Sequence, residues 1–267
     1  MRVRTRAPSA LPDNAGEFVV WGDAAVKIRG ILFDKDGTIV DYARTWVPMN
    51  REAALFAASG DPQLAAELLR AHGQDPESGA VAGNSVLAVG SIADIAAAFA
   101  AHLGAHAPAG LTASLDRLFT EGGAKHAVLI PGADRALATL KRRGLRIGVA
   151  TNDSVSGLKA SLKRTGVLDL FDFTVGYDSG YGTKPDAGMA LAFCKTLGLQ
   201  PAEIAMVGDA VHDLAMGRAA HAGLTVGVLS GTGTRQQLEP LADLILPSIS
   251  DLPALPAFGK RWWRLFA

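Results

Sequence analysis

The sequence predicts an α/β fold, a doubly wound, mostly parallel (Rossmann-like) sheet that carries an inserted α-helical cap. Short apolar runs alternate with helical segments between residues 131 and 246, which is typical of strand–helix–strand units in a parallel sheet. Between residues 47 and 125 strand-like sequence almost disappears, and alanine-rich helical sequence replaces it. We therefore expect an N-terminal arm at 1–27, an α/β core at 28–46 and 126–267, and a helical cap at 47–125.

Composition excludes several other classes of protein. The 267 residues are 49% hydrophobic and 19% charged, so the chain is long and apolar enough to bury a substantial core. A formal net charge of zero gives no overall attraction to nucleic acid or to an anionic membrane. The single cysteine, Cys194, rules out an internal disulfide, and no apolar run is long enough to cross a bilayer. We expect a cytoplasmic protein without nucleic-acid partners or stable membrane association.

The two ends of the chain offer few signals. Residues 1–16 look disordered and lack the hydrophobic core of a signal peptide, and residues 17–21 fit a short strand. The aromatic and basic stretch 261–266 is expected to pack back on the domain, because so short a segment binds lipid weakly.

The first strand of the core ends at a cluster of polar residues. Residues 31–33 are apolar at consecutive positions, as in a parallel strand that is buried on both faces. Asp34 and Asp36 follow, and alternation along an extended chain sends both to the same side. In open α/β sheets ligands bind at this end of the strands, and a divalent cation would offset the repulsion between two close carboxylates. An ordinary polar turn is the alternative interpretation.

In the cap, Asp61-Pro62 fits the N-terminus of a helix, and Ser91 with Asp94 fits a capping box. The expected elements of the cap are a helix from 62, a glycine-rich loop at 73–90, a helix at 92–103 and a third helix at about 112–120. We expect the hinges of the cap near residues 42–48 and 122–127, with Gly122 and Gly123 absorbing the backbone change.

In the core, strands are expected at 145–150, 173–175, 204–207, 224–229 and 244–246. Helices are expected at 131–143, 154–164 and 186–197, from about 213 to 221, and at 234–241. Polar groups suited to phosphate chemistry follow these strands. Thr151, Asn152 and the amides beside them could form an anion site at a helix start, Lys184 lies in a loop, and Asp209 ends a strand with Asp213 close behind. Helix capping and an ordinary surface lysine are the alternative interpretations.

Four groups of residues, taken in chain order, resemble motifs I to IV of the haloacid dehalogenase-like hydrolase superfamily. They are Asp34-Lys35-Asp36-Gly37-Thr38, then Thr151, then Lys184, and finally Gly208-Asp209 with Asp213. The resemblance spans about residues 28–246, and the cap position matches the C1 type found in phosphoglycolate phosphatase-like members.

The resemblance implies a role for each matching residue. Asp34 would attack phosphorus and form an aspartyl-phosphate, while Asp36 would protonate the leaving oxygen and then activate water. Thr151, Asn152 and Lys184 would hold the phosphate of the substrate. Mg²⁺ would be the cofactor. Its implied ligands are Asp34, Asp36 through its backbone carbonyl, Asp209 and, in support, Asp213.

Lys35 departs from the commonest pattern, in which an apolar residue separates the two aspartates. We expect its side chain to point away from the site, where it would be neutral to the chemistry; otherwise it would add positive charge near the phosphate. Ala210 replaces a common serine, and the neighbouring His212 is not required by the implied mechanism.

The favoured function is a Mg²⁺-dependent phosphatase acting on a small phosphorylated metabolite. A phosphomutase of the β-phosphoglucomutase type would share all four motifs and stays open. Asp36 argues against a dehalogenase, and the absence of lysine from residues 46–124 argues against phosphonoacetaldehyde hydrolysis. A phospho-accepting regulatory module is the non-enzyme alternative. Arg44 and Arg51 are the cap cations nearest to Asp34 in sequence, and Arg51 is the candidate for meeting a second negative group on the substrate.

Overall fold

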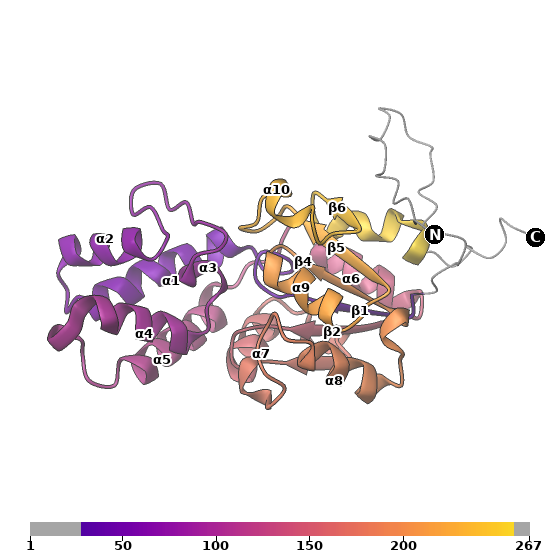
Figure 1. The fold of residues 1–267 in the computed structure, drawn as a ribbon, viewed down its shortest axis with the longest axis horizontal. Helices are drawn as coiled ribbons and strands as arrows, with labels where there is room; N and C mark the ends of the chain where they lie inside the picture. Colours follow the sequence, from indigo (N-terminus) through magenta and orange to yellow (C-terminus); the bar gives the residue numbers. More distant parts are fainter. Residues whose placement is uncertain (1–27, 259–267) are drawn as a thin grey trace, which may run out of the picture.

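The computed structural model describes residues 28–258 and divides them into a helical lobe and a sheet-containing lobe (Figure 1). The expectations for residues 1–16, 17–21 and 261–266 fall outside the described residues. Within the described range, no helix is long and apolar enough to cross a membrane.

The sheet has six parallel strands in the order β3-β2-β1-β4-β5-β6, which confirms the predicted α/β fold. Their bounds are β1 Gly30–Phe33, β2 Arg146–Ala150, β3 Phe173–Val175, β4 Ile204–Gly208, β5 Leu224–Val228 and β6 Leu244–Leu246. Phe33 is in register with Val149 and Val207, so β1, β2 and β4 end at nearly the same level. The strand order changes direction between β1 and β4, which is where ligands bind in such sheets.

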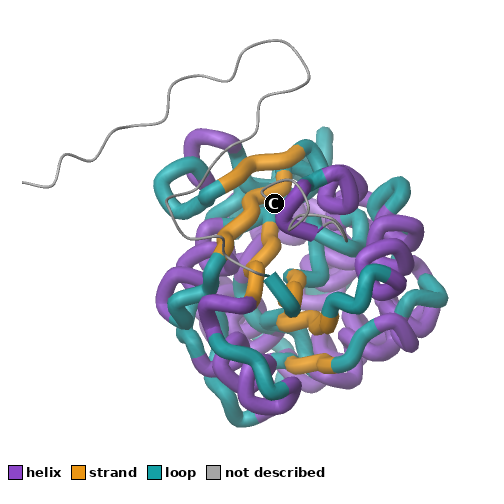
Figure 2. Tube along the Cα trace, turned by 90° about the vertical axis from the view of Figure 1, so that its right-hand side faces the viewer, coloured by secondary structure: helices purple, strands orange, loops and turns teal. Residues whose placement is uncertain are grey.

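Helices cover both faces of the sheet (Figure 2). Ile31 and Phe33 of β1 face one hydrophobic cluster together with α6 (Ala133–Arg142) and α7 (Val155–Arg164). Leu32 faces the other cluster with α8 (Gly188–Leu197) and α9 (Val211–Ala219). The short helix α10 (Arg235–Leu238) precedes β6. The consecutive apolar residues of β1 therefore serve two opposite cores, as expected of a buried parallel strand.

The second lobe contains α1 (Tyr42–Ala57), α2 (Pro62–Ala71), α3 (Val86–Val89), α4 (Ile92–Leu103) and α5 (Leu111–His126), and we call it the cap. It has a hydrophobic cluster of its own. The chain enters and leaves the cap along two adjacent segments. The Asp41 amide donates to the Val128 carbonyl at 2.8 Å, and the Ile130 amide donates to the Ile39 carbonyl at 2.9 Å.

Local structure in the cap differs from the expectation in two places. Helix α1 was not predicted, because it contains Pro48 and starts with aromatic and β-branched residues that are weak helix formers. Burial of one side of α1 against the rest of the cap outweighs that propensity. The loop expected at 73–90 contains the short helix α3, and α5 is longer than the helix expected at 112–120.

The expected hinge glycines lie inside a helix. A Cβ on Gly122 would lie 2.1 Å from Met49 Sδ, and one on Gly123 would lie 2.5 Å from Ser161 Oγ. These glycines therefore let α5 approach α1 and α7 closely. The cap boundaries expected between residues 46 and 47 and between residues 125 and 126 also fall inside α1 and α5. A boundary that cuts no helix would instead lie in the two adjacent segments by which the chain enters and leaves the cap. The division into domains stays a prediction.

Candidate active site

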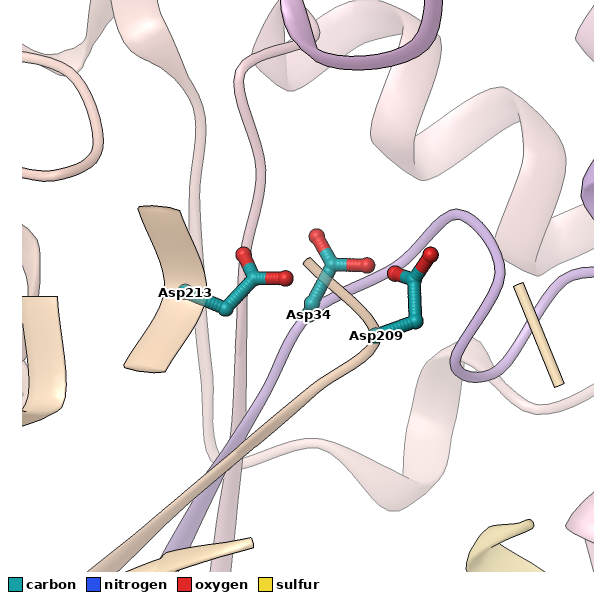
Figure 3. A group of neighbouring side chains, drawn as sticks. All are labelled: Asp34, Asp209 and Asp213. Atoms are coloured by element: carbon teal, nitrogen blue, oxygen red, sulfur yellow. The ribbon is translucent and has the colours of Figure 1, made fainter. Parts of the chain in front are cut away.

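Three buried carboxylates meet at the carboxyl ends of β1 and β4. Asp34 directly follows β1, Asp209 follows β4, and Asp213 lies in the first turn of α9; one oxygen from each lies within 4.8 Å of the others. Figure 3 shows the three side chains rising on the same side of the chain, with Asp34 between the other two. Sequence reasoning had named all three, and the parallel strands bring them together.

One oxygen of this cluster lacks a partner. Asp34 Oδ2 is buried and accepts no hydrogen bond from the described residues. A buried carboxylate oxygen without a donor is costly, whereas carboxylate oxygens are the ligands that hard divalent cations prefer. The donor set therefore fits a divalent metal ion held by Asp34 and Asp209, with Asp213 beside them.

The electrostatics agree with this fit. Burial raises the pKa of Asp34 above its ordinary value despite the nearby Lys184 ammonium. Burial also raises the pKa of Asp209 well above its ordinary value, and the charges of Asp34 and Asp213 add to the effect. A cation between these carboxylates would stabilise their ionised forms and so oppose both pKa shifts.

Asp209 is held by the loops around it. Its Oδ2 accepts a hydrogen bond from the Thr232 amide at 2.8 Å, and Oδ1 accepts one from Thr38 Oγ1 at 3.4 Å. Gly37 has a φ of +83°, and a Cβ at this position would lie 2.5 Å from Asp209 Oδ2. Glycine is needed here both for the backbone conformation and for the close approach.

Lys184 contacts two of the clustered carboxylates. Its buried Nζ contacts Asp34 Oδ1 and lies 2.7 Å from Asp213 Oδ1. Burial alone would lower the pKa of Lys184, but the carboxylates of Asp213 and Asp34 outweigh burial and raise the pKa above its ordinary value, so the ammonium stays charged. Burial likewise opposes ionisation of Asp213, yet His212 and Lys184 bring its pKa below the ordinary value. The loop lysine expected from the sequence is thus part of the cluster.

The side chain of Asp36 lies apart from the three clustered carboxylates. Trp46 Nε1 in the cap donates a hydrogen bond to Asp36 Oδ1, and Lys35 Nζ lies 3.2 Å from Oδ2. Burial raises the pKa of Asp36 to about 6, with the Lys35 charge opposing the shift. Such a carboxyl group can both give and take a proton near neutral pH.

The expectation that Lys35 is neutral to the site is wrong. Its side chain is fully buried, and its Nζ contacts Asp153 as well as Asp36 and lies 4.9 Å from the Trp46 ring centroid. Burial lowers the pKa of Lys35, but the Asp153 and Asp36 carboxylates raise it more. Alternation failed as a guide because β1 ends at Phe33 and the chain turns. Sequence reasoning had not paired Asp153 with Lys35.

Thr151 and Asn152 follow β2, beside the carboxylates. Thr151 is buried and its hydroxyl accepts a hydrogen bond from the Asp153 amide at 3.1 Å. Asn152 Oδ1 accepts from the Lys184 amide at 3.0 Å, and Asn152 Nδ2 donates to the Val89 carbonyl of the cap at 3.2 Å. Both polar atoms of the Asn152 side chain are thus engaged within the protein, where they join the core to the cap.

A pocket lies between the clustered carboxylates and the cap. Its core side, which we call the floor, includes Asp34, Asp36, Thr151 and Asp209. Its cap side, which we call the roof, is formed largely by Trp46, Leu87, Val89, Ile92, Ile95 and Phe119. Arg44 and Arg51 are exposed and do not line the pocket, contrary to the expected contact between Arg51 and the substrate.

Comparisons with known proteins agree with this architecture. The family model for haloacid dehalogenase-like hydrolases matches residues 28–221. The chain is 30% identical over 228 residues to a phosphoglycolate phosphatase of Chromobacterium violaceum, covering 84% of this chain and 95% of the relative. It is 29% identical over 193 residues to an N-acetylmuramic acid 6-phosphate phosphatase of Pseudomonas putida, covering 72% and 79%.

Among solved structures, CbbY from Rhodobacter sphaeroides in complex with phosphate is similar, with a TM-score of 0.63 at 23% identity over 84% of this chain and 96% of that one. This likeness supports the fold, while the family match covers both lobes up to α9 and all four groups of candidate site residues. The chain therefore belongs to the haloacid dehalogenase-like hydrolases, as an enzyme of their phosphatase class.

Proposed function

We propose that the protein is a Mg²⁺-dependent phosphomonoester hydrolase that acts on a small phosphorylated metabolite through an aspartyl-phosphate on Asp34. One observation carries this proposal. Asp34 has a buried, unpartnered Oδ2 among clustered carboxylates, while its Oδ1 contacts the Lys184 ammonium. A carboxylate placed between a metal position and a fixed cation is suited to attack an anionic phosphate.

Each residue has a stated task in this proposal. Asp34, Asp209 and the Asp36 backbone carbonyl hold Mg²⁺, which supplies charge neutralisation to the attacking carboxylate and the phosphate. Lys184 and the Thr151 hydroxyl stabilise the transferring phosphoryl group. In the first displacement Asp34 forms a bond to phosphorus and the bond to the leaving oxygen breaks.

Asp36 moves the protons in both displacements. Its carboxyl group gives a proton to the leaving oxygen as the aspartyl-phosphate forms, and its carboxylate then takes a proton from the water that hydrolyses it. Trp46 and Lys35 orient this group through the contacts described above. The apolar roof excludes other water from the charged floor.

The test uses the full-length enzyme with Mg²⁺ and simple phosphomonoesters. We expect equal amounts of alcohol and free phosphate without any added sugar bisphosphate, loss of turnover on chelation and recovery with Mg²⁺. Acid quenching during turnover followed by mass analysis should place the phosphoryl group on Asp34. Full activity in excess chelator would refute the metal dependence. Transfer between two positions of one sugar with little free phosphate would identify a mutase instead.

A further inference from the structure

The roof of the pocket offers no cation to a substrate. Among the described residues, the pocket lining includes neither lysine nor arginine. The two nearby ammonium groups, on Lys35 and Lys184, are fully buried, and each is already paired with two carboxylates. His212 lines the floor, with its Nε2 3.5 Å from Asp213 Oδ1. The remaining charged groups of the lining are carboxylates.

The hydrogen-bond donors on the polar side chains of the roof are engaged within the protein. The Tyr42 hydroxyl donates to the Leu87 carbonyl and accepts from Asn50 Nδ2 at 3.2 Å. Asn50 Nδ2 also donates to Gln74 Oε1 at 2.8 Å, while Trp46 Nε1 donates to Asp36. The surface that the roof leaves for a ligand is therefore mainly apolar.

Three further groups of the cap that could carry positive potential, namely the start of α4, Arg51 and Arg44, supply no free cationic side chain to the pocket lining. The first turn of α4 carries Asp94, whose carboxylate accepts a hydrogen bond from the Ser91 amide at 2.9 Å and offsets the positive helix end. Arg51 is exposed, and its Nη2 donates to the Pro76 carbonyl at 3.1 Å. Arg44 is exposed on α1.

We propose that the substrate carries a single anionic group, its phosphate, on an uncharged alcohol that presents an apolar face to the roof. This inference rests on the proposed function and names the substrate class for the same site. Around the floor, the two ammonium groups of Lys35 and Lys184 are already paired with the carboxyl groups of Asp34, Asp36, Asp153 and Asp213. The Mg²⁺ of the proposed function would be neutralised by Asp34, Asp209 and the phosphate itself, so no cation is left for a second anionic group. A second phosphate or carboxylate on the substrate would lie against apolar side chains and near these acids without a partner.

The inference separates this chain from the substrates in two relatives' names, because N-acetylmuramic acid 6-phosphate also carries a carboxylate. Phosphoglycolate carries a carboxylate beside its phosphate ester, and the roof provides nothing to neutralise it. A phosphate ester of an uncharged alcohol of the same size would avoid the free-energy cost of removing a carboxylate from water when it enters the pocket. The expected preference is therefore set by charge and not by size.

Matched pairs of substrates test this with the full-length enzyme at saturating Mg²⁺. 2-Hydroxyethyl phosphate and phosphoglycolate differ mainly in the carboxylate, as do phenyl phosphate and 4-carboxyphenyl phosphate. We expect kcat/KM to be at least about tenfold higher for the uncharged member of each pair, mostly through KM. An equal or higher kcat/KM for the carboxylated members would overturn the inference.

A charge introduced into the roof provides the second test. Val89 lines the pocket, and its contact with Asn152 uses the backbone carbonyl, so Val89→Lys changes the lining and Val89→Met controls for side-chain length. Relative to Val89→Met, we expect Val89→Lys to raise the preference for the carboxylated members by about threefold. No shift in that ratio would show that a missing cation is not the cause.

Failure of the proposed function gives a different result. Absence of phosphate release from all four compounds, together with no phosphoryl group on Asp34, would refute the phosphatase and with it the substrate class. Phosphate release with the opposite charge preference would refute the substrate class alone. If Val89→Lys does not fold, the ratios measured on the parent enzyme still decide.

Discussion

The floor and the roof of the pocket are built in opposite ways. The floor carries polar and charged side chains just after strands β1, β2 and β4, whose ends lie in one register. Asp34 and Asp36 are held by ion pairs with buried lysines, and Asp209 by a backbone hydrogen bond from Thr232. The roof consists of helices whose apolar side chains extend a separate hydrophobic cluster. The difference indicates that the sheet positions the reacting side chains, whereas the cap determines the shape of the pocket and excludes water from it. Changes in the floor should therefore reduce rate, and changes in the roof should alter preference.

The largest effect is expected from Asp34→Asn. An amide cannot attack phosphorus, so phosphate release should fall below about 1% of the parent rate. The fold should persist, because Asn is nearly isosteric and removes a buried charge. Asp169→Asn, at an exposed aspartate, is the matched control and should keep full activity. Steady turnover well above that level in Asp34→Asn would break the assignment of the nucleophile.

Asp209→Asn should come next, by weakening metal binding. We expect the apparent Mg²⁺ affinity to fall about 10- to 100-fold in activity titrations, since a charged ligand is replaced by a neutral one. Thermal unfolding supplies an independent measurement. Burial and neighbouring carboxylates raise the pKa of Asp209, so the metal-free variant should melt at a higher temperature than the metal-free parent.

Adding Mg²⁺ should then raise the melting temperature of the parent much more than that of Asp209→Asn. Equal Mg²⁺-dependent shifts in both proteins would exclude Asp209 as a ligand.

The pH dependence should reveal the two tasks of Asp36. Its pKa is raised to about 6, so the group is mostly protonated below that pH and mostly ionised above it. With an alkyl phosphate, rapid quenching should show aspartyl-phosphate formation slowing above about pH 6 and its hydrolysis slowing below. An aryl phosphate with a good leaving group should lack the first decline, because its leaving oxygen needs no proton. Identical profiles for both substrates would contradict the acid role.

Lys35→Met should reduce kcat by about tenfold with little change in KM, because Lys35 positions Asp36 and does not line the pocket. The substitution keeps the length of the side chain but removes the cation shared by Asp36 and Asp153. Loss of that cation raises the pKa of Asp36 further. The pH above which aspartyl-phosphate formation slows and the pH below which its hydrolysis slows should therefore both increase. Lys163→Met, at an exposed lysine, is the matched control. An unchanged pH profile would reduce Lys35 to a structural role.

Sequence reasoning succeeded where local pattern and sheet geometry decide the outcome. Asp34 and Asp209 were each expected at the end of a buried strand, the family resemblance implied that they share a metal site, and the structure brings them together. Ser91 was expected to cap α4, as it does. Lys35 could not be placed in the same way, because its partner Asp153 is 118 residues away along the chain. A signal was nevertheless present, since Lys35 stands where the commonest pattern has an apolar residue, and a lysine buried at such a position needs carboxylate partners. Helix α1 was missed because packing, and not propensity, stabilises it.

The smallest effect is expected from Arg51→Ala. The sequence placed Arg51 close to the catalytic loop and suggested that it meets a second negative group of the substrate. In the structure its guanidinium is exposed and bound to the Pro76 carbonyl, outside the pocket. We therefore expect KM to change by less than about twofold for phosphoglycolate and for 2-hydroxyethyl phosphate alike.

Phe119→Ala, which removes an aromatic wall of the pocket, should alter KM for phenyl phosphate in the same assay. A selective rise in KM for phosphoglycolate in Arg51→Ala would mean that the cap brings a cation to the substrate, and the contrast between a charged floor and an apolar roof would no longer hold.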